Sequence, residues 1–329
     1  MLYETEEQLK RIAAKLKREL GSVIVAALEN PETLEVCVNS DGHIWVEEKT
    51  KRLYDTGKWI APENLLAALG TIAARSGIEL NESTPILESR LPLDGSRVEG
   101  AIPPVTPDGP SIAIRKHASA IWPLRRYVEE KRISAEAADY LRDAIRGAKN
   151  ILVAGGTSSG KTTFINALIQ ELLTIAPRDR LLVIEDELEL QCATDNKERF
   201  VTSKNVSMRT LIKTAMRYRP DRIIIGEVRD GAALDLLKSW NTGHPGGFAT
   251  IHSNDALSAL TRLEQLILEA AQSPMSSLIA EAVNIVVYMR EFGRVGRQVT
   301  EIIWVTGYKG GEYQYRQIYE SGARDSGKE

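Results

Sequence analysis

A glycine-rich segment near the middle of the chain constrains the fold more than any other feature. Residues 155–162 read GGTSSGKT and match the pattern GxxxxGK followed by Ser or Thr. The apolar run ILVA precedes the segment, and the helix-favouring run TFINALIQELL follows it. The glycines allow backbone N–H groups to turn toward a bound phosphate, and the start of the helix adds partial positive charge. We therefore predict a strand, a phosphate-binding loop and a helix here, rather than a turn that binds nothing.

The residues of this loop have specific expected roles. We expect Lys161 to reach the β and γ phosphates of a nucleotide, and the Thr162 hydroxyl to ligate Mg²⁺. The predicted nucleotide-binding residues are Gly155, Gly156, Thr157, Ser158, Ser159, Gly160, Lys161, Thr162 and Thr163. A phosphate loop alone does not distinguish a kinase, a switch GTPase or a motor. The class of protein therefore has to be inferred from acidic residues elsewhere in the chain.

The composition fits a folded chain without a membrane span. The 329 residues exceed one typical domain of about 100 to 200 residues, which predicts two domains. The net charge of −3 argues against a globally basic coat that binds nucleic acid. The longest apolar run is six residues, 23–28, whereas a helix that spans a bilayer needs about 20. Cys37 and Cys192 form no CxxC pair, which fits a reducing, cytoplasmic compartment.

Residues 1–116 predict a mixed α+β domain. Apolar residues recur every three or four positions over residues 9–20, which is the pattern of an amphipathic helix. Two alternating runs flank the Ser-Asp-Gly sequence of residues 40–42, a strong signal for a hairpin. We expect a second helix over residues 62–76 and two further short strands between residues 96 and 116.

The rest of the chain predicts a linker, an α/β domain and a tail. Residues 117–135 contain Trp-Pro and a charged run, and are the expected linker. Over residues 136–319, the apolar runs ILVAGG, RLLVIED and RIIIGEV alternate with helical stretches. This order is typical of a mostly parallel sheet with helices on both faces. Residues 320–329 are polar and are expected to form a disordered tail.

Two of these predicted strands end in carboxylates. Glu185 closes one apolar run and Glu189 follows it shortly, while Glu227 follows the other. Carboxyl ends of parallel strands share one edge of a sheet, which is where Mg²⁺ and an attacking water would lie. The second strand is irregular, because Gly226 stands where an acidic residue commonly ends the run.

Two of the four histidines, His244 and His252, lie in the segment GHPGGFATIHSN. A zinc site is not expected, because no third ligand is near and the HExxH spacing is absent. Both side chains could simply cap or pack a turn. The alternative that we favour is a phosphate sensor, in which a ring N–H or the nearby Asn amide detects the γ phosphate and moves the adjacent helix.

With these four elements in order, the chain resembles the secretion-superfamily traffic ATPases, the hexameric motors of type IV secretion, type II secretion and type IV pili. Residues 155–162 resemble the Walker A motif of the family, and residues 184–189 its acidic box. Residues 226–229 resemble its atypical Walker B motif, and residues 244–254 its histidine box. The resemblance implies a RecA-like P-loop NTPase core that is preceded by a smaller α+β domain.

Finer features favour one group within this family. The zinc-bearing ATPases of type II secretion carry two CxxC pairs, which are absent here. The runs LEVCVNSDGHIWVEE, LPLDGSRVEGAIPPV and RYRPDRIIIGEVRDGAALDLLKSWNTGHPG look most like the conjugative-transfer ATPases of the TrbB type.

The resemblance implies Mg²⁺-dependent hydrolysis of ATP at a cleft between two domains. Thr162 would hold Mg²⁺, with Glu227 contributing partly through water. Glu185 is the first choice to orient the attacking water, and Glu189 is the alternative, because spacing does not show which side chain points into the site. His244 and His252 would sense the nucleotide.

The resemblance also implies roles for two arginines and an assembly with partners. Arg97 and Arg115 match the positions of the family's arginine fingers, although they could also be ordinary surface arginines. Arg217, Arg219 and Arg222 are expected to form structural ion pairs, with an interface role as the alternative. The implied assembly is a homo-oligomer, a hexameric ring that lies in the cytoplasm against the inner membrane and contacts components of a secretion or conjugation channel.

The sequence alone leaves three other functions open. One is an ATPase of pilus assembly or retraction, and another is a DNA translocase or helicase on the same core. Nucleic-acid binding is not favoured, because only 6% of residues are aromatic and no basic aromatic strip is present. The third is a scaffold that binds ATP and orders a channel without rapid turnover.

Overall fold

The structure is a computed structural model that describes residues 6–116, 121–203, 205–292 and 296–321. The chain divides into two compact units, with the division between residues 119 and 120. Residues 322–329 of the expected tail and residues 117–120 of the expected linker lie outside the described residues.

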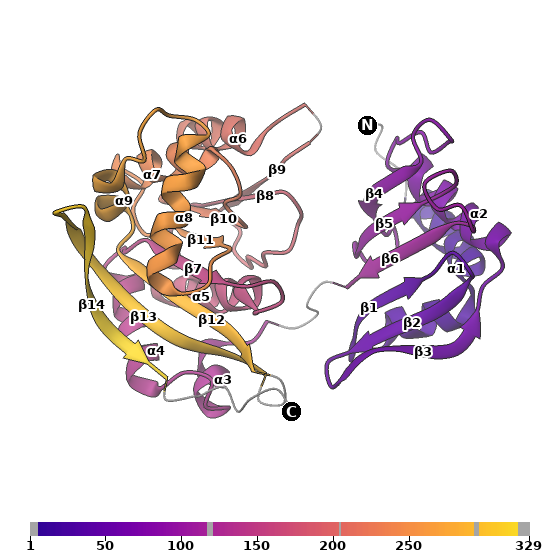
Figure 1. Ribbon diagram of the computed structural model, residues 1–329, viewed down its shortest axis with the longest axis horizontal. Coiled ribbons are helices and arrows are strands. Elements are labelled where there is room, and N and C mark those ends of the chain that lie inside the picture. Colours follow the sequence, from indigo (N-terminus) through magenta and orange to yellow (C-terminus); the bar gives the residue numbers. More distant parts are fainter. Residues whose placement is uncertain (1–5, 117–120, 204, 293–295, 322–329) are drawn as a thin grey trace. The chain divides into compact units, whose positions relative to one another are not determined.

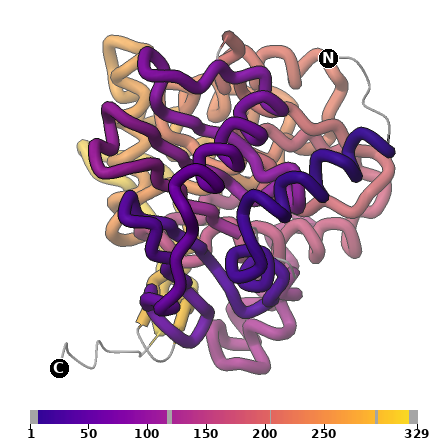
Figure 2. Tube along the Cα trace, turned by 90° about the vertical axis from the view of Figure 1, so that its right-hand side faces the viewer, coloured from indigo at the N-terminus to yellow at the C-terminus, as the bar shows by residue number. Residues whose placement is uncertain are grey.

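Unit 1 is a six-stranded sheet with two helices on one face (Figure 1). The strand order is β3-β2-β1-β6-β5-β4, and all neighbours are antiparallel. Figure 2 shows α1 in indigo, facing the viewer. The elements of this unit are α1 (Glu6–Glu29), β1 (Thr33–Val38), β2 (His43–Glu48), β3 (Lys51–Trp59), α2 (Pro62–Arg75), β4 (Ile86–Arg90), β5 (Arg97–Ala101) and β6 (Ser111–Arg115).

The alternation of buried and exposed residues explains this layer arrangement. Inner residues of the central strands, such as Val98 and Ile114, are fully buried against the two helices. The helix α2 approaches so closely that a Cβ on Gly100 would collide with Leu69. The hairpin predicted around residues 40–42 is confirmed, because β1 pairs with β2 across that turn.

Unit 2 is an eight-stranded sheet in the order β14-β13-β12-β7-β11-β10-β8-β9. Its strands from β12 to β9 are parallel neighbours, whereas β13 and β14 run antiparallel. The elements are α3 (Leu124–Glu129), α4 (Ala135–Arg146), β7 (Ile151–Gly155), α5 (Lys161–Ile175), β8 (Leu181–Glu185), β9 (Lys197–Val201), α6 (Met208–Ala215), the 3-10 helix η1 (Met216–Tyr218), β10 (Arg222–Ile225), α7 (Ala232–Asn241), β11 (Phe248–Ile251), α8 (Ala256–Leu268), α9 (Ser276–Ala282), β12 (Ile285–Phe292), β13 (Gly296–Lys309) and β14 (Glu312–Glu320).

Helices cover both faces of this second sheet. One hydrophobic core joins the sheet to α3, α4 and α5, and the other joins it to α6, α7, α8 and α9. The strands β7 and β8 are buried at every position, as expected for strands covered on both sides. The α/β class predicted from the sequence is therefore confirmed.

The expected linker carries structure that belongs to unit 2. Helix α3 lies within residues 117–135, and its residues Leu124 and Tyr127 are buried. The Tyr127 ring meets the ring of Phe164 in α5 edge to face, with 5.2 Å between centroids. Aromatic packing thus fixes this segment against the helix that follows the glycine-rich loop.

The helices and the two cysteines can be compared with the expectations from composition. None of the helices in the described part of the chain combines the length and apolar character that a membrane span needs. Cys37 and Cys192 are free thiols.

Candidate functional site

The residues singled out in the sequence gather at one edge of the sheet in unit 2. The glycine-rich loop follows β7, Glu185 ends β8, Glu227 follows β10 and His252 follows β11. Because these four strands are parallel neighbours, their carboxyl ends lie along the same edge, where binding sites of open α/β sheets form.

The loop holds an unusual backbone shape and a buried cation. Ser158 and Gly160 both have positive φ, +60° and +92°. Lys161 is only 7% exposed, and its ammonium donates hydrogen bonds to the carbonyl oxygens of Gly155 (2.9 Å) and Gly156 (2.8 Å). Burial lowers the pKa of Lys161 to about 8. Within the described part of the chain, the hydrogen-bond partners of this ammonium are the two loop carbonyls and one imidazole.

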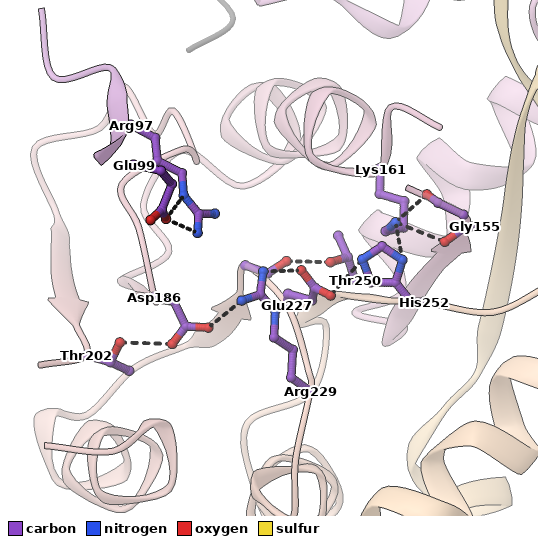
Figure 3. A network of polar contacts seen from close by, with 12 residues as sticks. Arg97, Glu99, Gly155, Lys161, Asp186, Thr202, Glu227, Arg229, Thr250 and His252 are labelled. Atoms are coloured by element: carbon purple, nitrogen blue, oxygen red, sulfur yellow. Dashed lines mark hydrogen bonds and ion pairs between the residues drawn. The ribbon is translucent and has the colours of Figure 1, made fainter. Parts of the chain in front are cut away.

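That imidazole belongs to His252, which bridges Lys161 and Glu227 (Figure 3). Its Nδ1 lies 3.4 Å from the Lys161 ammonium, and its Nε2 lies 3.0 Å from Glu227 Oε1. Burial and the nearby Lys161 charge lower the pKa of His252. A neutral ring satisfies both contacts, because Nδ1 then accepts from Lys161 and Nε2–H donates to Glu227.

The network continues from Glu227 across the ends of two more strands (Figure 3). Arg229 donates to Glu227 Oε2 at 2.7 Å and lies 3.7 Å from Asp186, which accepts from the Thr202 hydroxyl at 2.9 Å. Thr250 in β11 donates to the Gly226 carbonyl at 2.6 Å. Asp186 and Thr250 lie inside the acidic box and the histidine box, but we gave neither a role from the sequence, and Thr202, which follows β9, lies in none of the motifs.

Glu185 is placed differently from Glu227. Its side chain is 2% exposed, and Oε1 accepts from the backbone N–H groups of Glu189 (2.8 Å) and Leu190 (2.6 Å). Its Oε2 accepts from Arg199 at 3.0 Å. The carboxylate is thus used to anchor the loop that follows it. Burial raises the pKa of Glu185 despite these donors.

The position of Glu185 also explains the irregular second strand. A Cβ at Gly226 would lie 3.2 Å from Glu185 Cγ, which is tighter than ordinary contact. The glycine therefore gives room to the neighbouring carboxylate side chain. The acidic residue of that strand follows one position later, at Glu227, where it reaches His252.

Four other predicted residues lie in the loop, in the helix after it, or in the acidic segment. The side chain of Glu189 is exposed, whereas its amide is one of the donors to Glu185. Thr162 and Thr163 are partly buried in the first turn of α5. Ser159 is buried and donates to the Gly156 carbonyl at 2.9 Å, which helps to close the loop.

His244 is not brought to the site, which corrects the prediction that both histidines meet the nucleotide. His244 precedes β11 and its Nδ1 lies 2.9 Å from the Pro220 carbonyl, whereas His252 follows the same strand. The four residues of β11 separate them by about 13 Å at ~3.3 Å per residue. His244 therefore packs at the opposite edge of the sheet.

Arg222 has the structural role that we expected for its cluster. It is 5% exposed and forms an ion pair of 2.6 Å with Asp179. It also donates to the carbonyls of Ile145 and Gly246, which ties α4 to the start of β11.

In unit 1, the sheet places three arginines in one row. Arg97 in β5 stands directly opposite Arg115 in β6 and directly opposite Arg90 in β4. Arg97 also donates to Glu99 on its own strand, at 3.0 and 3.3 Å (Figure 3). Like charges in directly opposed positions are unfavourable, and here Glu99 pairs with Arg97 while Glu35 in β1 stands directly opposite Arg115. Sequence reasoning found Arg97 and Arg115 but missed Arg90.

The fold and the loop define an α/β protein with a candidate phosphate-binding site at the carboxyl edge of a parallel sheet. The chain belongs to the type II/IV secretion system protein family, whose model matches residues 18–301. This confirms the family resemblance that we inferred from the motifs.

Two curated relatives and one solved structure give detail. The chain is 45% identical over 313 residues to the conjugal transfer protein TrbB of Rhizobium radiobacter, covering 94% of this chain and 96% of that protein. It is 31% identical to the type IV secretion system protein PtlH of Bordetella pertussis, with 84% and 91% covered. The fold resembles that of the ATPase DotB of Yersinia pseudotuberculosis, with a TM-score of 0.64, 20% identity and 92% and 80% covered.

Proposed function

We propose that this chain is an ATPase that drives assembly of, or transport through, a type IV secretion or conjugative transfer channel. Family membership and the identity to TrbB and PtlH support this proposal. We further propose that unit 2 is a RecA-like P-loop NTPase core, because β7 enters the loop at the centre of a parallel sheet and α5 leaves it.

The single observation that carries the ATPase proposal is the buried ammonium of Lys161. Its hydrogen-bond partners among the described residues are two carbonyls and one imidazole nitrogen. A buried charge without a counter-ion is costly, and an anionic phosphate removes that cost. The loop residues 155–163 therefore fit the phosphates of ATP, with Lys161 contacting the β and γ groups.

Mg²⁺ fits the same edge of the sheet. Bound MgATP supplies the reactive phosphoanhydride and a cation that neutralises charge on its phosphates. Thr162 would hold the ion directly, and Glu227 through water. Mg²⁺ commonly takes one or two protein ligands and fills its other positions with phosphate and water, so this small donor set is sufficient.

Glu227, rather than Glu185, is the carboxylate that we propose to orient the attacking water. Glu227 shares a network with Lys161 through His252, whereas both oxygens of Glu185 accept bonds from its own loop and from Arg199. Glu189 remains the alternative. His252 is the proposed phosphate sensor, because a phosphate that attracts Lys161 competes with the imidazole contact.

Arg97 and Arg115 are proposed to complete the site in an assembled ring. A guanidinium next to the transferred phosphoryl group contributes about 10³ to 10⁵ in rate. We propose a homohexameric ring that lies at the cytoplasmic side of the inner membrane and contacts channel components there. Mass measurement with and without ATP tests the ring.

Phosphate release by the purified full chain under multiple turnover tests the enzymatic proposal. Lys161→Ala is expected to abolish turnover, whereas Lys238→Ala, which removes an exposed lysine of α7, is expected to leave it unchanged. A single turnover only would instead support the scaffold alternative. Severalfold stimulation by single-stranded DNA would support a translocase.

A mixing experiment tests the arginines. Arg97→Ala is expected to lose turnover although Lys161 and its loop are intact. If Arg97 acts on the nucleotide of a neighbouring subunit, rings that mix Arg97→Ala and Lys161→Ala chains regain part of the activity. Full turnover by Arg97→Ala alone refutes its assignment.

A further inference from the structure

The hairpin of β12 and β13 lies beside the phosphate loop and brings an arginine onto it. In the sheet, β12 is next to β7, and Met289 stands opposite Gly155. At the start of β13, the side chain of Arg297 covers Gly160. A Cβ on Gly160 would lie 2.8 Å from Arg297 Cδ and 3.5 Å from its Cβ and Cγ. The aliphatic part of Arg297 therefore packs directly on the last glycine before Lys161.

Arg132 forms two hydrogen bonds with the backbone of β13 at and just after this arginine, one as donor and one as acceptor. Arg132 Nη1 donates to the Arg297 carbonyl at 3.0 Å, and the Arg132 carbonyl accepts from the Val299 amide at 3.0 Å. Arg132 is itself held by an ion pair of 2.9 Å with Glu130 and by the Trp122 ring, 4.9 Å from its guanidinium. The start of β13 is thus clamped to the segment that opens unit 2.

The guanidinium of Arg297 has a different environment from that of Arg132. It forms no ion pair or hydrogen bond with any residue that the structure describes, and the residue is partly buried. Its stem is fixed on the loop, and its charge acts on the Tyr127 phenol, whose pKa it lowers against the larger effect of burial. A guanidinium binds phosphate oxygens through directed, charge-assisted hydrogen bonds. Phosphate is also the group that the loop itself is shaped to hold.

We propose that Arg297 is a phosphate-binding residue of the nucleotide site and that Arg132 is the positioning residue that keeps it over Gly160. This inference rests on the proposed function of the same loop. Arg297 lies far from the loop in the sequence, and only the hairpin next to β7 brings it there.

Direct binding of inorganic tripolyphosphate and of ATP to the full-length chain tests the proposal by calorimetry. Arg297→Met keeps the aliphatic contact with Gly160 and removes the charge, so the fold is retained. We expect it to weaken binding of both ligands about 10- to 100-fold, the range of lost charge-assisted hydrogen bonds. Arg297→Lys should recover part of the affinity. Arg290→Ala, which removes an exposed positive charge from the same hairpin, should change it less than twofold.

Two results overturn the proposal. In one, Arg297→Met binds both ligands as the wild-type chain does. In the other, only ATP binding weakens while tripolyphosphate binding is unchanged, which means that Arg297 contacts the nucleoside. If the wild-type chain itself binds neither ligand, the proposed function fails as a whole, so the two failures are distinguishable.

A double-mutant comparison tests the role of Arg132. Arg132→Ala alone should weaken tripolyphosphate binding, because Arg297 loses its fixed backbone. Added to Arg297→Met, the same change should weaken binding no further. A general structural role of Arg132 predicts equal losses in both backgrounds and refutes the positioning role.

Discussion

The side chain of Glu185 offers the sharpest test of how the acidic loop is built. In Glu185→Ala, the buried amide of Leu190 loses its acceptor, which costs about 1–3 kcal/mol. The Glu189 amide keeps the Glu187 carbonyl at 2.9 Å, and Arg199 keeps the Leu190 carbonyl at 2.9 Å, so neither is fully orphaned. The lost packing adds about 1 kcal/mol. We expect unit 2 to lose about 2–4 kcal/mol of unfolding free energy.

Hydrogen exchange at the Leu190 amide measures this loss locally, and denaturant unfolding measures it globally. In Glu185→Ala, exchange of that amide should accelerate at least about 10-fold. The matched control is Glu189→Ala, whose side chain is exposed and should cost less than about 0.5 kcal/mol. Unchanged protection and stability in Glu185→Ala, together with lost turnover, would refute the anchoring role and restore Glu185 as the catalytic carboxylate.

The same residue gives a pH test with a defined sign. Burial raises the pKa of Glu185 above its ordinary value of 4.5, so the folded chain binds this proton more tightly than the unfolded chain. The stability contributed by this proton is present at low pH and is lost as the pH rises through the folded pKa. The stability of the wild-type chain relative to Glu185→Gln should therefore rise as the pH falls from 7 toward 4.5. A pH-independent difference contradicts the buried state of the carboxyl group.

Three further predictions concern the loop and its supports. Because burial lowers the pKa of Lys161 to about 8, tripolyphosphate affinity should fall by up to about 10-fold per pH unit above 8, and calorimetry should find no such step in Lys161→Arg. Asn150 is 3% exposed and its side chain forms three hydrogen bonds to backbone groups, so Asn150→Ala should cost about 2–4 kcal/mol and lower Tm by about 5–15 °C. Asp255 caps α8 with a reciprocal bond to Ser258, so Asp255→Ala should cost about 1 kcal/mol in denaturant unfolding, and an unchanged midpoint contradicts the cap.

Local sequence signals were sufficient to predict the glycine-rich loop and the parallel strands around it. The loop pattern, its flanking strand and its helix are all contiguous, so residues 155–162 carry the whole signal. The burial of β7 and β8 on both faces likewise follows from uninterrupted apolar runs. Contiguous patterns of this kind do not depend on which strands become neighbours.

Contacts between segments that lie far apart in the sequence could not be predicted from local patterns. Glu185 is sequestered because the chain turns back over residues 186–190 and because β9 brings Arg199 beside it. Arg297 reaches the loop only through the place of β12 in the sheet. The prediction that His244 lies at the site could have been avoided. The apolar run FATI between the two histidines is itself a strand, and the two ends of a strand lie at opposite edges of the sheet.

The tight contact between Glu185 and Gly226 makes these two positions one unit of variation. A larger residue at 226 requires the side chain at 185 to shift or to shorten, and a shorter residue at 185 leaves space beside 226. Related chains should therefore exchange bulk between the two positions in pairs, and a carboxylate moved from one strand to the other should move only together with a glycine in the opposite direction.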